Sequence, residues 1–246
     1  MSDGSVERAE SVSTDGEIAR LRDVYETRDA AMPHRAWEKN IYHPRHPLGH
    51  LFQEHNHDAL VSVLNRLMID LEGLDILDVG CGYGHWLRYL VDLGADAKRL
   101  AGIDLSEQRI AAARAANPAI CWIREEATGL PFPPSCFDIV LQSVVFSSIL
   151  EKEQRAALAD EMWRVVRPGG LIFWVDQKKD VGESLVGFSK KTVCEYFPHG
   201  EIVYARSVHP RYFRKLYGYA PGLAQALYRT MRFGCESWFL AIEVDK

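Results

Sequence analysis

Residues 76–87 read Ile76-Leu77-Asp78-Val79-Gly80-Cys81-Gly82-Tyr83-Gly84-His85-Trp86-Leu87, and this stretch decides the fold. Its first four residues have the length and apolar character of a buried strand. Glycine then recurs at every second position, which favours a tight turn with positive φ angles, and a helical pattern begins after the turn. In an open α/β sheet, such a first turn lies at the carboxyl ends of the strands, in the crevice where ligands bind.

Short apolar runs alternate with longer helical patterns along the rest of the chain. Strands are predicted at Ile76–Val79, Leu100–Ile103, Ile120–Ile123, Phe137–Leu141, Leu171–Val175, Ile202–Val208 and Trp238–Val244. Helices are predicted at about 17–31, 51–72, 85–93, 107–116 and 151–166, and near 222–231. Strands rich in Val, Ile and Leu indicate a parallel sheet that is covered on both faces. The predicted fold class is therefore α/β, a doubly wound domain.

The composition is that of an ordinary globular domain, with 47% hydrophobic and 26% charged residues. A chain of this length favours one large domain. The formal net charge of −5 disfavours a protein dedicated to nucleic acid. The five cysteines are scattered and include no C-x-x-C pair, so neither a disulfide framework nor a zinc cluster is expected. Because no long apolar stretch and no secretion signal is present, we expect a cytoplasmic protein.

Three parts of the chain differ in composition. Residues 1–16 are polar and predict a disordered tail. Residues 17–72 are expected to form N-terminal helices and a lid. Residues 73–246 are expected to form the main domain, with a basic and aromatic insertion at about 209–233 between the last two strands.

Asp104 supplies the second element of a nucleoside site. It ends the second predicted strand, 22 residues after Gly82, where a carboxylate can accept hydrogen bonds from both ribose hydroxyls. A dinucleotide fingerprint requires a small residue where this chain has His85 or Leu87, and the loop lacks the lysine of a phosphate-binding loop. The expected cofactor is therefore a nucleoside without a pyrophosphate.

Further motifs follow in the order that a known family has them. They are Glu126-Ala127-Thr128-Gly129-Leu130-Pro131-Phe132, then Cys136-Phe137-Asp138-Ile139-Val140, and then Glu161-Met162-Trp163-Arg164-Val165-Val166-Arg167-Pro168-Gly169-Gly170. Together with Asp78 and the G-x-G-x-G after it, they resemble the class I S-adenosylmethionine-dependent methyltransferases of the type 11-like group, over roughly residues 70 to 180. The resemblance implies a Rossmann-like seven-stranded sheet, mostly parallel with an antiparallel last strand, plus an N-terminal helical lid. It also implies an enzyme that uses S-adenosyl-L-methionine.

The resemblance also implies which residues bind this cofactor. They are Asp78, Gly80, Cys81, Gly82, Gly84, Asp104, Leu105, Glu126, Ala127 and Gln142. The glycine-rich loop would face the methionine part, with Asp78 ordering the loop and Gln142 near the sulfonium. Asp104 would hold the ribose, and Leu105 would pack on the adenine. Glu126 would accept a hydrogen bond from the adenine amino group, and the backbone amide that follows it would point at the ring.

Six of the nine histidines precede the first strand, namely His34, His43, His46, His50, His55 and His57. Of these, His50 and His57 would share a helical face with Glu54, which suggests a metal site. Pro47 and Gly49 disfavour regular helix before residue 51, however, and no H-E-x-x-H is present. We predict no metal. A catalytic base among the histidines and a solvated surface both remain open, and no catalytic residue is assigned.

Two segments indicate which methyl acceptor the protein could use. Residues 142–148 lack the Asn/Asp-Pro-Pro-Tyr/Phe signature that is typical, in the resembling family, of enzymes that methylate planar nitrogens, so DNA is not expected as a partner. Residues 190–232 carry eight Lys or Arg against two acidic residues, interleaved with aromatic side chains. This mix suits a phosphorylated or lipid-linked acceptor or peripheral contact with an anionic membrane, and a solvated helical face is the open alternative. By resemblance, Tyr42 and His43 are candidates for the lid.

Our first functional hypothesis is methyl transfer from S-adenosylmethionine to an oxygen or nitrogen of a small or medium acceptor, such as a glycan or a lipid-linked intermediate. Two alternatives stay open. One is a non-catalytic S-adenosylmethionine-binding protein, and the other is an RNA methyltransferase, which the acidic net charge disfavours. The oligomeric state is not predicted.

Overall fold

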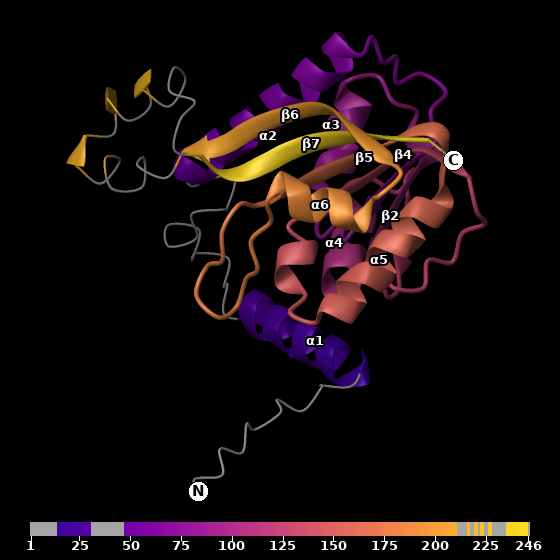
Figure 1. Ribbon diagram of the computed structural model, residues 1–246, viewed down its shortest axis with the longest axis horizontal. Helices are drawn as coiled ribbons and strands as arrows, with labels where there is room; N and C mark the ends of the chain where they lie inside the picture. Colours follow the sequence, from indigo (N-terminus) through magenta and orange to yellow (C-terminus); the bar gives the residue numbers. More distant parts are fainter. Residues whose placement is uncertain are drawn as a thin grey trace, which may run out of the picture.

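The computed structural model describes residues 14–30, 47–210 and 235–245, together with residues 216, 219–220, 222–223 and 226–227. In these residues one seven-stranded sheet has the order β3-β2-β1-β4-β5-β7-β6 (Figure 1). Its strands are β1 (Ile76–Val79), β2 (Leu100–Asp104), β3 (Cys121–Arg124), β4 (Phe137–Ser143), β5 (Val166–Gln177), β6 (Gly200–Pro210) and β7 (Cys235–Val244). Strands β1 to β5 pair in parallel, whereas β7 runs antiparallel to both β5 and β6. The predicted sheet is confirmed.

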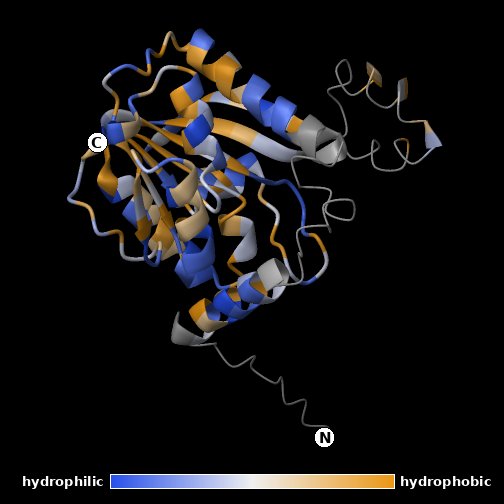
Figure 2. Ribbon diagram, turned by 180° about the vertical axis from the view of Figure 1, so that it is seen from behind, coloured by the Kyte–Doolittle hydropathy of each residue, from blue (hydrophilic) through white to orange (hydrophobic). Residues whose placement is uncertain are grey.

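Helices cover both faces of this sheet. They are α1 (Thr14–Ala30), α2 (Pro47–Arg66), α3 (His85–Asp92), α4 (Glu107–Ala116), α5 (Lys152–Val165) and α6 (Lys190–Tyr196), with short 3₁₀ helices η2 (Ala97–Arg99) and η3 (Phe146–Ser148). The apolar residues of α2, α3 and α4 pack in one buried cluster, and those of α1, α5 and α6 pack in a second one. Figure 2 shows the mostly apolar strands between helices that carry polar residues. None of the described helices has the length and apolar character needed to cross a membrane.

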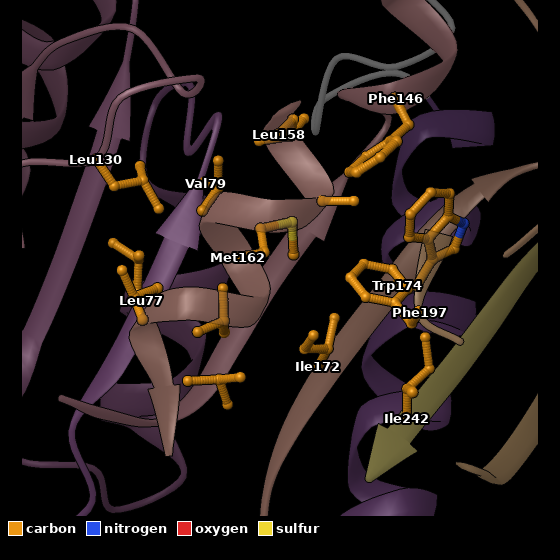
Figure 3. Close-up of a cluster of buried hydrophobic side chains, with 14 of the residues drawn as sticks. Leu77, Val79, Leu130, Phe146, Leu158, Met162, Ile172, Trp174, Phe197 and Ile242 are labelled. Carbon is orange, nitrogen blue, oxygen red and sulfur yellow. The ribbon is translucent and has the colours of Figure 1, made fainter. Parts of the chain in front are cut away.

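The second cluster fixes the centre of the sheet (Figure 3). Leu77 and Val79 of β1 meet Leu158 and Met162 of α5, and Trp174 extends the contact along β5. All five side chains are buried. Truncation of one of the larger side chains to Ala would cost about 2–5 kcal/mol, since the cavity left behind would not be refilled. The strands whose carboxyl ends carry the predicted site are therefore held rigidly.

Helix α2 differs from its predicted range at both ends. It begins at Pro47, because proline is tolerated in the first turn, where its missing amide costs no hydrogen bond. The prediction that Pro47 and Gly49 disfavour helix before residue 51 is therefore wrong. The helix ends at Arg66 rather than near residue 72, since Met68 has a φ of 53°, which is incompatible with a continuing helix.

Two other elements differ from the prediction. Strand β5 begins at Val166 instead of Leu171, so residues 167–170 form an irregular start of the strand, with a register shift opposite Phe137. Helix α6 was not predicted. It is only seven residues long, and its signal was Ser189, whose hydroxyl accepts a hydrogen bond from the amide of Thr192 at 3.1 Å. The helix predicted near 222–231 is described only at 222–223 and 226–227, which are helical.

Candidate functional site

A cavity of about 150 Å³ lies where α1 meets the carboxyl ends of β2 and β4. Its wall includes Gly80, Asp104, Leu105, Glu126 and Ala127, all of them predicted cofactor-binding residues. The other predicted residues lie beside it: Cys81, Gly82 and Gly84 in the loop after β1, and Asp78 and Gln142 in β1 and β4. The structure thus brings the predicted residues to one edge of the sheet.

Asp104 is held by two backbone amides. Its Oδ2 accepts a hydrogen bond from the Gly82 amide at 2.9 Å, and its Oδ1 accepts one from the Ser106 amide at 2.9 Å. The residue is 7% exposed and lines the cavity. A carboxylate has about four acceptor sites, so each oxygen keeps one for a ligand. This geometry fits a pair of ribose hydroxyls.

The glycine-rich loop needs glycine for two reasons. Gly80 and Gly84 have φ angles of 70° and 72°, which residues with a Cβ rarely adopt. A Cβ at Gly80 would also lie 2.4 Å from Cγ2 of Val145, and one at Gly84 would lie 2.2 Å from Cη2 of Trp122. The loop is therefore wedged between Val145 after β4 and Trp122 of β3.

The environment of the Asp78 carboxyl indicates whether the site suits a cationic ligand. The residue is 1% exposed, and neither carboxylate oxygen has a hydrogen-bond partner among the described residues. Burial, and then the nearby charge of Asp104, raise the pKa of Asp78 well above its ordinary value. A buried carboxyl without partners is costly, and a positively charged group beside it would remove that cost. S-Adenosylmethionine carries an ammonium and a sulfonium, so these residues fit it.

Glu126 faces α1 as well as the cavity. Its Oε1 accepts a hydrogen bond from Nη2 of Arg22 at 3.1 Å, in an ion pair that is open to solvent. The loop after Glu126 is fixed from α5, because Glu161 accepts from the Leu130 amide at 2.7 Å. Arg164 donates to the Leu130 carbonyl at 3.0 Å and pairs with Glu161 at 2.6 Å. The Glu126-to-Leu130 segment is thus anchored against the domain.

Helix α1 forms a wall of the cavity. An N-terminal helical lid was expected from the resemblance, but none of the side chains in this wall was assigned from the sequence. Ile18, Leu21 and Tyr25 line the cavity. Their spacing of three and four residues places them on one helical face, and this spacing was the signal available in the sequence. The lid candidates named by resemblance, Tyr42 and His43, lie outside the described residues.

Glu17 anchors α1 to the connection between η3 and α5. The residue is 2% exposed, and its Oε1 accepts a hydrogen bond from the Leu150 amide at 2.7 Å. Arg20 donates to Glu17 at 2.7 Å and to the Ser148 carbonyl at 2.7 Å. Burial acts to raise the pKa of Glu17, but the hydrogen bonds from Arg20 and the Leu150 amide outweigh it, so the pKa is lowered.

The turn after β4 is strained. Val144 has a φ of 62°, which is rare for a β-branched residue, and its side chain lines the cavity. Its carbonyl accepts a hydrogen bond from the Ser148 hydroxyl at 2.9 Å, and Gln142, which is buried, accepts one from the Val145 amide at 3.1 Å. Backbone strain of this kind is often found at functional sites. Here it brings Val145 against the glycine-rich loop.

Two of the described histidines, His57 and His85, form a contact between helices. His57 of α2 lies with its Nε2 2.9 Å from Nε2 of His85, and its ring stacks on Tyr89 of α3. Burial, and then the charge of Arg88, lower the pKa of His85. Among the described residues no group of three or more His, Cys, Asp or Glu is arranged to hold a metal. Three of the other predicted histidines, His34, His43 and His46, lie outside that part of the chain.

Comparison with known proteins agrees with this geometry. A family model described as a methyltransferase domain matches residues 76–170. A ubiquinone biosynthesis O-methyltransferase from Rhizobium johnstonii is 29% identical over 186 residues, which cover 71% of this chain and 71% of that protein. A malonyl-(acyl-carrier protein) O-methyltransferase from Pectobacterium atrosepticum is 32% identical over 109 residues, or 44% of this chain. The match to this second relative spans only 41% of its length.

Solved structures share the fold. An S-adenosylmethionine-dependent methyltransferase from Mesorhizobium loti superposes with a TM-score of 0.55 at 20% identity, covering 75% of this chain and 97% of that one. The cyclase SpnF superposes with a TM-score of 0.56 at 22% identity, covering 78% and 83%. At such identities the likeness concerns the fold, and one fold can carry different reactions.

Proposed function

We infer that the chain belongs to the class I S-adenosylmethionine-dependent methyltransferases, and from this premise we propose that it transfers the methyl group of S-adenosylmethionine to an oxygen or nitrogen of a small or medium acceptor. The observation that carries the proposal is the cavity beneath α1, where Asp104, with spare acceptor sites, meets Glu126 and the glycine-rich loop. Beside that loop, the carboxyl of Asp78 has no hydrogen-bond partner in the described part of the chain and suits a cation.

The residues of the site bind and orient, since the cofactor itself supplies an activated methyl group on a sulfonium. Asp104 would hold the ribose, Glu126 the adenine amino group, and Asp78 would offer negative charge to the methionine part. Helix α1 would keep water from the site through Ile18 and Leu21. Positioning of two reactants in this way lowers a barrier by about 7–11 kcal/mol.

Oxygen is the favoured acceptor atom, because two relatives are named O-methyltransferases. A hydroxyl acceptor requires a base or strong polarisation, whereas an amine can lose its proton before it binds. We propose that the acceptor or its carrier bears an anionic group, as a lipid-linked intermediate with a phosphate would. In support, Nζ of Lys178 and Nζ of Lys190 both lie over the ring of Trp238 in β7, at 3.8 and 4.9 Å from its centroid, so two cations gather at one aromatic side chain.

Binding of the cofactor is the first test. Calorimetry would compare S-adenosylmethionine and S-adenosylhomocysteine on the wild type, on Asp104→Ala and on Asp96→Ala. Asp96 is the matched control, since its carboxylate also accepts from a backbone amide, that of Lys98, but it caps η2 away from the cavity. We expect Asp104→Ala to weaken binding at least tenfold, because a ligand hydroxyl left without its partner costs about 1–3 kcal/mol. Failure of the folded wild type to bind either ligand would contradict the proposal.

Turnover is the second test. Formation of S-adenosylhomocysteine would be followed with phenolic, carboxylate, amine and lipid-linked acceptors, each with and without a phosphate. Binding without product from any of them would favour the non-catalytic alternative. Product from RNA, with a binding constant that falls steeply as salt rises, would favour the RNA methyltransferase alternative.

A further inference from the structure

Arg109 is a buried cation in the wall of the cavity. It lies in α4, five residues after Asp104, and is 7% exposed. Its side chain lines the same cavity as Asp104. A guanidinium keeps its charge at every physiological pH, and burial of a charge is costly unless it is compensated. The buried charge of Arg109 therefore requires compensation from the groups around it.

Two aromatic rings from distant parts of the chain contact this guanidinium. Its carbon Cζ lies 4.4 Å from the ring centroid of Tyr25 in α1 and 5.7 Å from that of Tyr83 in the glycine-rich loop. Both distances lie within the range of cation–π attraction. A guanidinium is planar and can offer one face to each of two rings, which the compact ammonium of a lysine does less well. Arg109 thus joins α1 to the loop after β1.

Both partners are held separately at their far ends. The carbonyl of Tyr83 accepts a hydrogen bond from Nη1 of Arg88 in α3. Helix α1 is anchored near its start by Glu17, which binds the Leu150 amide. Tyr25 lies two turns further along α1 and lines the cavity. The contact with Arg109 is therefore one link between the cavity-facing part of α1 and the glycine-rich loop.

We propose that Arg109 is a positioning residue that couples docking of α1 to occupancy of the cofactor cavity, through Tyr25 on one side and Tyr83 on the other. A ligand that fills the cavity would order the glycine-rich loop and, through Arg109, would hold α1 in place. By thermodynamic linkage, docking of α1 then strengthens ligand binding by the same factor. The identity of the ligand rests on the proposed function, whereas the coupling of α1 to Arg109 does not.

The first experiment measures α1 directly. Hydrogen exchange of the amides in residues 16–27 would be followed with and without S-adenosylhomocysteine in the wild type, Arg109→Met and Arg109→Lys. Met keeps the length of the side chain and removes the charge. We expect Arg109→Met to speed exchange in α1 already without ligand and to weaken S-adenosylhomocysteine binding about tenfold. Arg109→Lys should show a smaller increase of α1 exchange and a smaller loss of binding than Arg109→Met, since an ammonium retains the attraction to one ring.

Arg114→Met is the matched control. Arg114 belongs to the same helix α4, and its Nη2 donates to the Trp122 carbonyl at 2.9 Å, away from α1. The control should lower the melting temperature with no selective change in α1. A change of α1 exchange that is equal in Arg114→Met and Arg109→Met, after correction for their melting temperatures, would overturn the proposal.

A double-mutant cycle tests the partner ring. Tyr25→Phe keeps the ring and should behave as the wild type, whereas Tyr25→Leu should resemble Arg109→Met. The double variant Tyr25→Leu/Arg109→Met should be no worse than either single variant, because one contact is lost only once. Fully additive effects on α1 exchange would show that the two residues act independently, against the proposal.

The two proposals fail in different ways. If the folded wild type binds no S-adenosylhomocysteine, the proposed function fails, yet exchange of α1 in the ligand-free variants still decides the role of Arg109. If S-adenosylhomocysteine binds but α1 exchange is unchanged in Arg109→Met, the coupling is wrong and the proposed function stands.

Discussion

Asp104 accepts a hydrogen bond from the Gly82 amide at 2.9 Å, which ties the end of β2 to the glycine-rich loop after β1. The same carboxylate accepts from the Ser106 amide at the start of α4. A single side chain therefore orders the loop, begins a helix and keeps acceptor sites for a ligand. Its loss should affect stability as well as binding.

Asp104→Asn is expected to separate these two roles. An amide side chain has one acceptor oxygen, so one of the two backbone amides would face an NH₂ group and lose its partner. We expect unfolding by urea to show a loss of about 1–3 kcal/mol, together with weaker S-adenosylhomocysteine binding. Unchanged stability would mean that the two backbone contacts do not form in solution.

Asp78 should make cofactor binding depend on pH. Its pKa is raised well above the ordinary value in the ligand-free protein, and a bound cation would lower it. Binding should then release a proton, and affinity for S-adenosylmethionine should rise with pH up to the raised pKa. Calorimetry in buffers with different ionisation enthalpies measures the released proton, and Asp78→Asn should bind more weakly with no proton release.

Glu17 should make docking of α1 sensitive to acid. Its folded pKa is lowered from the ordinary 4.5, so its stabilising effect is present above that pH and is lost as the pH falls through the lowered pKa. Glu17→Ala also removes the partner of the half-buried Leu150 amide, at a cost of about 1–3 kcal/mol. Urea unfolding from pH 3 to pH 7 would show the wild type approaching the variant in acid. Parallel curves would contradict the ion pair.

Val144 offers a test in which the usual order of two substitutions is reversed. At a φ of 62°, a residue with a Cβ pays about 1–2 kcal/mol that glycine does not. We expect Val144→Gly to be more stable than Val144→Ala by about 1 kcal/mol in urea unfolding. At Val145, the neighbouring control, Ala should be the more stable of the two.

The sheet was predictable because each strand is a local pattern. The run Ile76–Val79 and its glycines are adjacent in the sequence, and β1 agrees with them residue by residue. Helix ends were less predictable. The end of α2 depends on the positive φ angle of Met68, and nothing in the local sequence indicates that angle. The start of β5 depends on pairing with β4 across the sheet, which is not a local property.

The candidate site, too, was predictable only where its residues belong to local sequence patterns. Asp104 was found because it ends a recognisable strand, and Glu126 because it stands in a motif of the resembling family; the cavity brings them together. Tyr25 and Arg109 were missed because their contact joins helices from distant parts of the chain. The spacing of residues along α1 and α4 predicts which face of each helix is buried, but it does not predict which two faces contact each other. Roles at the atomic level, such as the contact of Glu126 with adenine, stay predictions that the binding experiments address.

Trp122 packs its indole into the space that two glycines leave open. A Cβ at Gly84 would lie 2.2 Å from this ring, and one at Gly102 would lie 2.6 Å from it. The three positions therefore behave as one steric unit shared by a loop and two strands. In related chains they should vary together: a side chain at position 102 should be accompanied by a smaller residue at position 122, and neither change should be tolerated alone.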